Sequence, residues 1–194
     1  MGQLSEGVTF PAKNNAFYAR IFAYFYPALP QGPSANYQVG FIFGSGQNDY
    51  GKVEAGVGIR GGDAQLLGYS IFYGPPFYQF GPSSATRATP NSWTCLELHE
   101  DGSSASTEVR QVWLNDQELT ELHTDSATVA GTSNDNHRSP ALDLVSVGLG
   151  EFFATPSLTD MWVDDIRVSS AKIGCQYCAS PAAAVLRTAR SIVS

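Results

Sequence analysis

Two stretches of this sequence alternate like β-strands and carry polar side chains that could do chemistry. In the first, which runs from Trp93 to His99, two leucines share one face while Cys95, Glu97 and His99 share the other. Side chains two residues apart on a strand stand side by side, with about 7 Å between their Cα atoms. Glu97 and His99 could therefore hydrogen-bond the hydroxyl groups of a ligand, or transfer protons if burial tunes their pKa values. A solvent-facing strand with one ion pair is the alternative interpretation.

The second stretch, Met161–Val168, places Asp164 on the same expected face as Trp162, Ile166 and Val168. A carboxylate on an apolar face must find a cation or several hydrogen-bond donors. Calcium, which takes oxygen ligands, is one solution, and a hydrogen-bonded structural aspartate is the other. The sequence therefore predicts that Asp164 is either a ligand of a structural calcium ion or a structural residue.

Aromatic side chains on outward faces are a third feature. On Val109–Leu114, the apolar alternation turns Trp113 outward beside Gln111. An exposed ring can stack on the C–H face of a sugar while a polar neighbour binds its hydroxyl groups. Packing against other parts of the fold is the alternative. The candidates for carbohydrate binding are Tyr24, Glu54, Arg60, Tyr73, Glu97, His99 and Trp113.

The strands that must position these residues are short and separated by turn residues. Alternation predicts them at Phe17–Tyr26, Tyr37–Phe43, Lys52–Arg60, Leu66–Tyr73, Trp93–His99, Val109–Leu114, Leu142–Leu149 and Met161–Ser169. About eight to ten strands favour an all-β fold, a two-sheet antiparallel β-sandwich. We expect one domain over residues 1–178 and a C-terminal tail, helical or disordered, over residues 179–194. On one face of Lys52–Arg60, Gly56 and Gly58 either leave room for a backbone or ligand, or mark a bulge.

Composition agrees with a sheet protein and excludes some partners. Only 15% of residues are charged, while the chain has 19 Gly, 9 Tyr and 11 Phe. A net charge of −7 without a basic cluster argues against nucleic acid and anionic membranes. No apolar run approaches the ~18 residues of a membrane span, and residues 1–6 do not resemble a secretory signal. Cys95 lies near the start of the predicted strand Trp93–His99, and Cys175 follows the last predicted strand; a bridge between such distant segments would favour an extracellular or cell-surface location.

These motifs resemble the concanavalin A-like jelly rolls of lectins and glucanases. Trp93-Thr94-Cys95-Leu96-Glu97, Trp113-Leu114-Asn115-Asp116 and Val163-Asp164-Asp165-Ile166 with Gly174-Cys175 are similar to segments of fungal cellulose-inducible proteins and of glucuronan and alginate lyases. The resemblance spans roughly residues 16–175. It implies a Cys95–Cys175 disulfide, and calcium at Asp164 as in the last strand of laminarinases. Two departures stand out: His99 replaces an aspartate of the glucanase catalytic signature, which argues against retaining hydrolysis, and relatives place one or two strands before Phe17.

Three functions follow from the resemblance. The preferred one is recognition of a polysaccharide or other glycan without catalysis, because binding needs only rings and polar groups. The alternative is a polysaccharide lyase that cleaves uronate-containing glycans by β-elimination. This reaction needs three catalytic groups, each held within about 0.5 Å of its productive position. Its candidates are Arg20 or Arg60 to neutralise the carboxylate, His99 as base, and Tyr69 or Tyr73 as acid. A structural or adhesive surface domain is the third function. Glycan binding and lyase chemistry both require that outward side chains from separate strands line one groove, namely Arg20, Glu54, Arg60, Tyr73 and His99.

Overall fold

The structure is a computed structural model, and it describes residues 3–6, 16–30, 38–48, 51–60, 64–73, 78–80, 82–101, 109–123, 142–152 and 159–176. Apart from one 3₁₀ turn at Thr120–Leu122, the regular elements in these ranges are strands. They are β1 (Gln3–Glu6), β2 (Phe17–Tyr26), β3 (Gln38–Asn48), β4 (Gly51–Arg60), β5 (Gln65–Tyr73), β6 (Tyr78–Phe80), β7 (Trp93–Asp101), β8 (Val109–Leu114), β9 (Gln117–Glu118), β10 (Leu142–Phe152) and β11 (Asp160–Ser169). The residues predicted to form a tail, 179–194, lie outside the described ranges.

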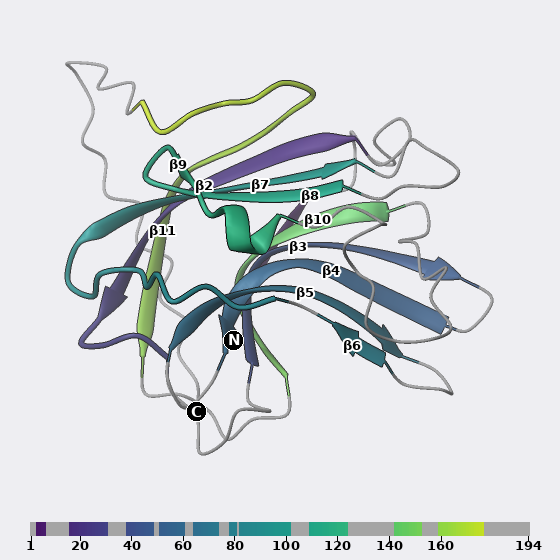
Figure 1. The fold of residues 1–194 in the computed structure, drawn as a ribbon, viewed down its shortest axis with the longest axis horizontal. Helices are drawn as coiled ribbons and strands as arrows, with labels where there is room; N and C mark the ends of the chain where they lie inside the picture. The colour runs from purple at the N-terminus through teal and green to yellow at the C-terminus, as the bar shows by residue number, and fades with distance from the viewer. Residues whose placement is uncertain are drawn as a thin grey trace.

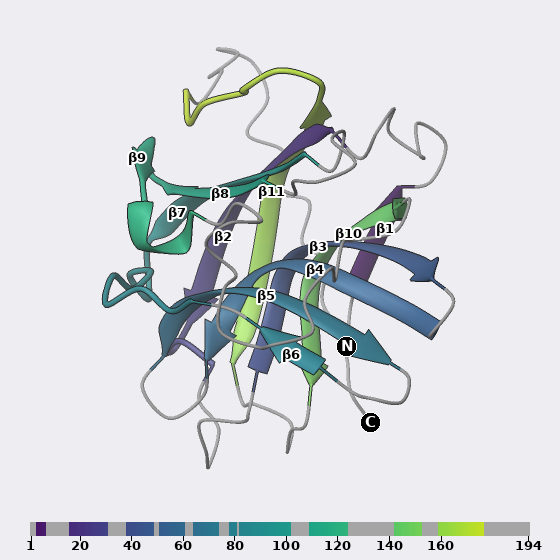
Figure 2. The same cartoon turned by 45° about the vertical axis from the view of Figure 1, so that its right-hand side comes forward.

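The strands form two antiparallel sheets that pack face to face (Figures 1 and 2). The six-stranded sheet has the order β1-β10-β3-β4-β5-β6, and the five-stranded sheet has the order β11-β2-β7-β8-β9. The prediction of an all-β, two-sheet antiparallel sandwich is confirmed. In the described part of the chain, no helix has the length and apolar character needed to cross a membrane.

The core lies between the sheets and follows the predicted alternation of β2. Phe17, Ile21 and Phe25 are almost completely buried on the inner face of this strand. They pack into one cluster with inner residues of both sheets, including Val57 and Ile59 of β4. Burying side chains of this size contributes roughly 1.5–3 kcal/mol each, so the apolar alternation determines which face of each strand turns inward.

The predicted strands all occur in the structure, with small changes at their ends. The pattern missed three short strands, β1, β6 and β9, because two to four residues carry too little alternation to identify a strand. β1 pairs with β10, so a strand does precede Phe17. The turn between β8 and β9 is formed by Asn115 and Asp116, whose φ angles of 52° and 68° fit a tight two-residue hairpin.

The glycine-rich face of β4 is closed by its neighbouring strand. A Cβ atom on Gly56 would lie 2.1 Å from the Ile42 carbonyl oxygen and 2.7 Å from the Phe43 Cα atom of β3. The register between β3 and β4 also shifts between Gly40 and Ile42, as it does at a β-bulge. Of the alternatives for Gly56, the structure supports close approach by another backbone.

Candidate functional site

The outer face of the five-stranded sheet, away from the core, carries five of the predicted site residues. Across the strands, Arg20 of β2 pairs with Glu97 of β7, and Glu97 pairs in turn with Trp113 of β8. Tyr24 and His99 lie on the same face, also on β2 and β7. Alternation thus assigned this face correctly.

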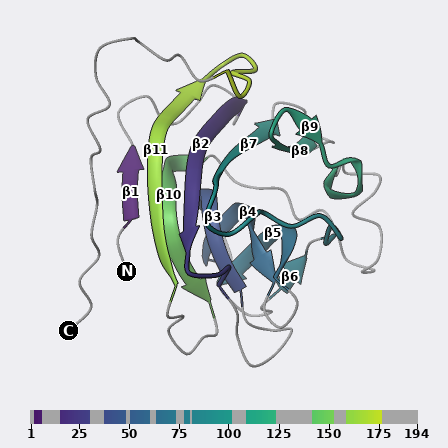
Figure 3. The same cartoon turned by 90° about the vertical axis from the view of Figure 1, so that its left-hand side faces the viewer.

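A C-terminal segment covers the middle of this face. After β11, residues 170–176, which we call the strap, turn back over the five-stranded sheet (Figures 1 and 3). A disulfide joins Cys175 of the strap to Cys95 of β7, with 5.8 Å between their Cα atoms. This is the disulfide that the resemblance implied. The Cys175 N–H also donates to Asp116 Oδ1 at 2.7 Å, which ties the strap to the β8–β9 turn.

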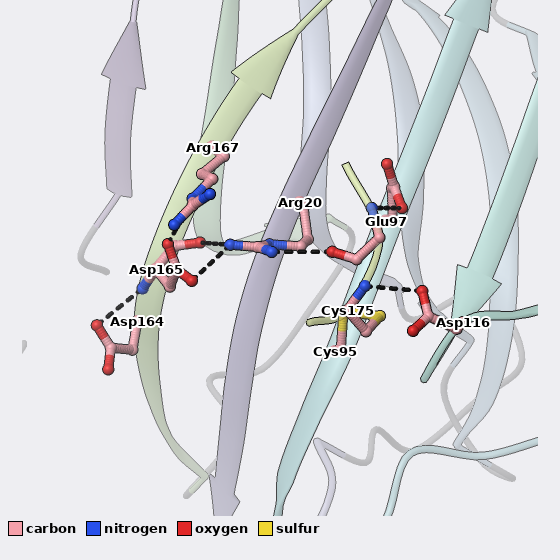
Figure 4. A network of polar contacts seen from close by, with 9 residues as sticks. Arg20, Cys95, Glu97, Asp116, Asp164, Asp165, Arg167 and Cys175 are labelled. Carbon is pink, nitrogen blue, oxygen red and sulfur yellow. Dashed lines mark hydrogen bonds and ion pairs between the residues drawn. A yellow bond between two sulfur atoms is a disulfide. The ribbon is translucent and has the colours of Figure 1, made fainter. Parts of the chain in front are cut away.

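Arg20 lies beneath the strap, where its side chain is only 1% exposed. Its Nη1 donates to the Gly174 carbonyl at 2.8 Å, and its Nη2 forms an ion pair with Asp165 Oδ2 at 2.6 Å (Figure 4). Its Nε is buried without a hydrogen-bond partner among the described residues. The Arg20 guanidinium therefore joins β2, β11 and the strap, and its burial does not fit the predicted role of neutralising a substrate carboxylate.

Glu97 is also used internally. It is fully buried, and its two carboxylate oxygens accept the backbone N–H groups of Ile173 at 2.7 Å and Gly174 at 3.0 Å. Both oxygens thus bind the strap. We expected Glu97 to be available to a sugar, but in the structure it has a structural role because the strap covers it. The strap is not a strand, so the alternation of apolar residues could not predict it.

The alternation of β11 is broken beside Arg20. The register with β2 shifts between Asp164 and Arg167, and Asp165 adopts a φ of 44°. Asp165 turns to Arg20 and Arg167, while Asp164 is exposed and its Oδ1 accepts the Asp165 N–H at 2.8 Å (Figure 4). The expectation of a buried Asp164 is therefore wrong: Asp164 keeps the facing of Trp162, but this face is open to solvent at Asp164, and the bulge changes only the facing of the residues after it. Within the described ranges no group of three or more His, Cys, Asp or Glu residues could hold a metal ion, and calcium at Asp164 stays a prediction.

One end of the outer face is a closed aromatic and polar cluster. The ring of Tyr18 stacks on His99 with centroids 4.1 Å apart, and His99 Nδ1 lies 3.0 Å from Gln111 Oε1. Trp113 is only 5% exposed, because Lys172 of the strap places its Nζ 4.3 Å from the centre of the indole. Burial raises the pKa of the Tyr18 hydroxyl, and the negative charges of Glu97 and Asp101 raise this pKa further. Trp113 thus points outward as predicted but is covered.

The other end of the face is an open cluster of four aromatic side chains. Tyr24 lies between Trp93 of β7 and Trp162 of β11, with ring centroids 5.6 Å and 5.2 Å away, and Tyr26 lies 5.9 Å from Trp162. Tyr26 is 49% exposed and Trp93 43%, while Tyr24 and Trp162 are half-buried. We call Tyr24, Tyr26, Trp93 and Trp162 the aromatic platform.

The chain holds the platform together where β2 ends and β7 begins. Asn91, at a φ of 59°, donates its N–H to the Phe25 carbonyl and its side-chain amide to the Pro27 carbonyl, both at 2.9 Å. These bonds fix the residues before Trp93 against the end of β2, which carries Tyr26. Of the platform, sequence reasoning identified only Tyr24. Trp93 and Trp162 become its neighbours only through the strand order β11-β2-β7, which the sequence does not reveal.

Solved structures of other proteins share this fold. One is the cellulose-induced protein Cip1, at 18% identity and a TM-score of 0.54, covering 82% of this chain and 70% of that one. Another is the PL-14 alginate lyase of Aplysia kurodai, at 12% identity and a TM-score of 0.51, covering 81% and 70%. A third is botulinum neurotoxin type C, whose cell entry depends on interaction with two ganglioside molecules, at 12% and 0.52, covering 89% and 37%. The fold is a concanavalin-like jelly roll. No family model matches the chain and no curated protein matches its sequence, and at these identities the structural likeness concerns the fold alone.

In this jelly roll the predicted groove residues are divided between the two layers. Glu54 and Arg60 belong to β4, and Tyr69 and Tyr73 to β5, all in the six-stranded sheet. Their side chains lie outside the part of the structure that is described. Arg20, Glu97, His99, Tyr24 and Trp113 belong to the other sheet, so the structure does not bring the predicted set together in one groove.

The outer face of the five-stranded sheet is itself divided by the strap. Trp93 and His99 are six residues apart on β7, which places the aromatic platform about 20 Å from the His99 cluster. The His99 cluster is covered by Lys172 and its polar groups bind one another. The aromatic platform has two exposed rings, Tyr26 and Trp93, beside two half-buried ones, and it is the candidate functional site.

Proposed function

We propose that this jelly roll is a carbohydrate-binding protein whose aromatic platform contacts the sugar. The exposed rings of Trp93 and Tyr26 beside half-buried Tyr24 and Trp162 carry the proposal. A cluster of exposed apolar side chains on a protein surface commonly marks a binding site. Tyr and Trp suit a sugar because each combines an apolar ring face with a polar O–H or N–H group.

The tilt of the rings favours a single glycan chain over a flat crystalline surface. The planes of Tyr24 and Trp93 meet at 61°, those of Tyr24 and Trp162 at 52°, and those of Tyr26 and Trp162 at 40°. Rings inclined in this way cannot all lie against one plane. They can surround successive units of a chain whose sugar faces turn along its length.

The proteins that share the fold support the proposal. Their names refer to induction by cellulose, to cleavage of alginate and to interaction with gangliosides, so each is connected with a carbohydrate. The Cys95–Cys175 disulfide supports an extracellular or cell-surface location, since such bonds persist in oxidising compartments. Polysaccharides and surface glycans are encountered in the same locations.

The test is glycan binding by wild-type protein and by Trp93→Ala. Affinity electrophoresis in gels containing soluble β-glucans, galactomannan, xylan or alginate measures binding without assuming one ligand. Truncating a central aromatic anchor costs about 2 kcal/mol or more, so Trp93→Ala should weaken binding about thirty-fold or more. Ile166→Ala is the matched control, because Ile166 is a similarly exposed apolar residue, at 38%, on β11 outside the platform. Binding that survives the loss of Trp93 would reject the platform as the site.

A lyase that acts by β-elimination on uronate-containing glycans is the second candidate, and the shared fold of the alginate lyase favours it. Of its predicted groups, Arg20 is buried beneath the strap and His99 hydrogen-bonds Gln111. Ultraviolet absorbance of unsaturated chain ends, followed during incubation with alginate and glucuronan, tests it directly. Growth of this signal would establish lyase activity, whereas binding without it supports recognition alone. If neither is found, a structural or adhesive domain becomes the better explanation.

A further inference from the structure

We infer that Asp160 is the residue through which the aromatic platform binds sugar hydroxyl groups, and that the ligand is a glycan whose hydroxyl groups are free and not O-substituted. The inference rests on the proposed carbohydrate function and adds to it a specificity-determining residue and a ligand class. It follows from the place of Asp160 beside the rings, on the same strand as Trp162.

The strand register places Asp160 next to two rings of the platform. On β11, Asp160 is paired with Tyr26 of β2, and Trp162 is paired with Tyr24. Residues directly opposite each other on antiparallel strands have Cβ atoms about 4.5–5.5 Å apart, so Asp160 is the cross-strand neighbour of Tyr26. Asp160 and Trp162 are two residues apart and face the same side, with about 7 Å between their Cα atoms. The register is continuous from Asp160 to Asp164, so the bulge does not change this facing.

The carboxylate of Asp160 is accessible to a ligand. The residue is exposed, and within the described ranges its side chain forms no hydrogen bond or ion pair. Asp164, on the other side of Trp162, already accepts the Asp165 N–H at 2.8 Å. In the turn that leads into β7, the hydroxyl group of Ser92 donates to a backbone carbonyl of the same turn at 3.1 Å. Asp160 therefore offers the platform a charged acceptor that internal contacts do not use.

The arrangement of the rings determines where the edge of a bound sugar lies. Trp162, Tyr24 and Trp93 form a row across β11, β2 and β7, with successive ring centroids 5.2 Å and 5.6 Å apart. A sugar stacks on such rings through its apolar C–H face, so its hydroxyl groups project from its rim along the protein surface. Asp160 and Tyr26 lie beside this row, two residues away on their strands. A sugar unit on Trp162 therefore directs the hydroxyl groups of one edge toward Asp160.

The polar groups around the rings complement a free hydroxyl group. The indole N–H groups of Trp93 and Trp162 only donate, and the ionised carboxylate of Asp160 only accepts. A sugar hydroxyl does both, and its bond to a charged acceptor is stronger than one to a neutral acceptor. A methyl or acetyl group on the sugar oxygen removes the donor. An apolar protein surface would likewise bury the carboxylate without a donor, which is costly. An unsubstituted glycan is the occupant that satisfies these groups.

The experiment is a double-mutant cycle between the carboxylate and the sugar hydroxyl groups. The ligands are oligosaccharides of the β-glucan or galactomannan that retards the wild-type protein in affinity gels, each native and O-methylated. Calorimetry measures their dissociation constants for the wild type and for Asp160→Ala. On the native ligand, Asp160→Ala should weaken binding about ten-fold or more. On the methylated ligand, the two proteins should bind within about three-fold of each other, because the donor is gone.

Three control variants accompany the cycle. Asp160→Asn keeps a carbonyl acceptor without the charge and should bind with an affinity between those of the wild type and Asp160→Ala. Glu118→Ala removes a charge from a side chain that is 31% exposed on β9 of the same sheet, and it should leave both affinities within about three-fold of the wild type. Trp93→Ala should weaken the native and methylated ligands alike, because stacking needs no hydroxyl group. Urea unfolding of Asp160→Ala should match the wild type, since Asp160 is exposed.

The outcomes separate the inference from the proposed function. If methylation weakens binding by the same factor in the wild type and in Asp160→Ala, the carboxylate does not bind the hydroxyl groups and the inference is overturned, while Trp93-dependent binding leaves carbohydrate recognition standing. An equal loss in Glu118→Ala would show that total charge, not the position of Asp160, sets the affinity, and would also overturn the inference. Absence of binding to any glycan, or a dimer in light scattering that Trp93→Ala dissociates, would overturn the proposed function and the inference with it.

Discussion

The hydrogen bonds between Glu97 and the strap allow us to predict how much stability the protein loses when Glu97 is replaced. Replacing Glu97 by Gln keeps the size of a side chain that is fully buried but converts one of its two acceptor oxygens into an NH₂ group. In the native protein the two oxygens accept the N–H groups of Ile173 and Gly174. In the variant one of these N–H groups faces another donor, and the bond that remains is no longer to a charged acceptor.

The expected cost follows from these two changes. A hydrogen bond to a charged acceptor is worth about 1.5–3 kcal/mol, and a buried backbone N–H left without an acceptor costs about 1–3 kcal/mol. The two figures overlap, because both describe the same lost bond. We therefore expect Glu97→Gln to lower the free energy of unfolding by about 2–4 kcal/mol with the disulfide intact.

Urea unfolding under non-reducing conditions, followed by tryptophan fluorescence, measures this free energy. Glu118→Gln is the control, because Glu118 lies on β9 of the same sheet, is 31% exposed, and accepts from the Gln111 side chain at 3.0 Å. That substitution should cost less than about 1 kcal/mol. A Glu97→Gln variant as stable as the control would refute the reasoning and would mean that the disulfide alone holds the strap.

Three further predictions concern the same face of the protein. Replacing both Cys95 and Cys175 by Ala opens a loop with a sequence separation of 80 and should cost about 3–5 kcal/mol in urea unfolding; a loss below about 1 kcal/mol would contradict this. Because burial raises the pKa of Tyr18, the folded state keeps its proton longer than the unfolded chain, so stability falls as pH rises above the ordinary tyrosine pKa of about 10. Tyr18→Phe should show a shallower alkaline decline, and an unchanged decline would exclude Tyr18 as its source. If calcium binds at Asp164, the melting temperature should be higher in calcium than in chelator, and Asp164→Asn should abolish the difference. Equal melting temperatures for the wild type would show that Asp164 does not hold a stabilising calcium ion.

Much of the fold could be predicted from local pattern. The inward face of β2 was identifiable because apolar residues at every second position of a strand lie on one face, and that face packs into the core. The positions of the longer strands followed from the same rule. The short strands β1, β6 and β9 did not, because pairing with a neighbour, and not alternation, defines them.

The candidate site could be predicted only in part. Tyr24 was correctly placed on the outer face, and so were His99 and Trp113. Alternation reports the direction of a side chain but not what lies above it, so the burial of Glu97 and the cover over Trp113 were missed. The bulge after Asp164 was likewise missed; it turns Asp165 toward Arg20 and Arg167 and changes the facing of the residues that follow.

The sequence by itself determined that this chain forms strands, which faces of them are apolar, and that two cysteines stand where a bridge could join distant segments. Those properties depend on neighbours one or two residues away. Only the tertiary structure decided that the strap covers Arg20 and Glu97, and that Trp93, Tyr24 and Trp162 meet across three adjacent strands. Both outcomes depend on contacts between residues some 70 to 155 positions apart, and the order in which strands pair is set by the packing of the whole sandwich.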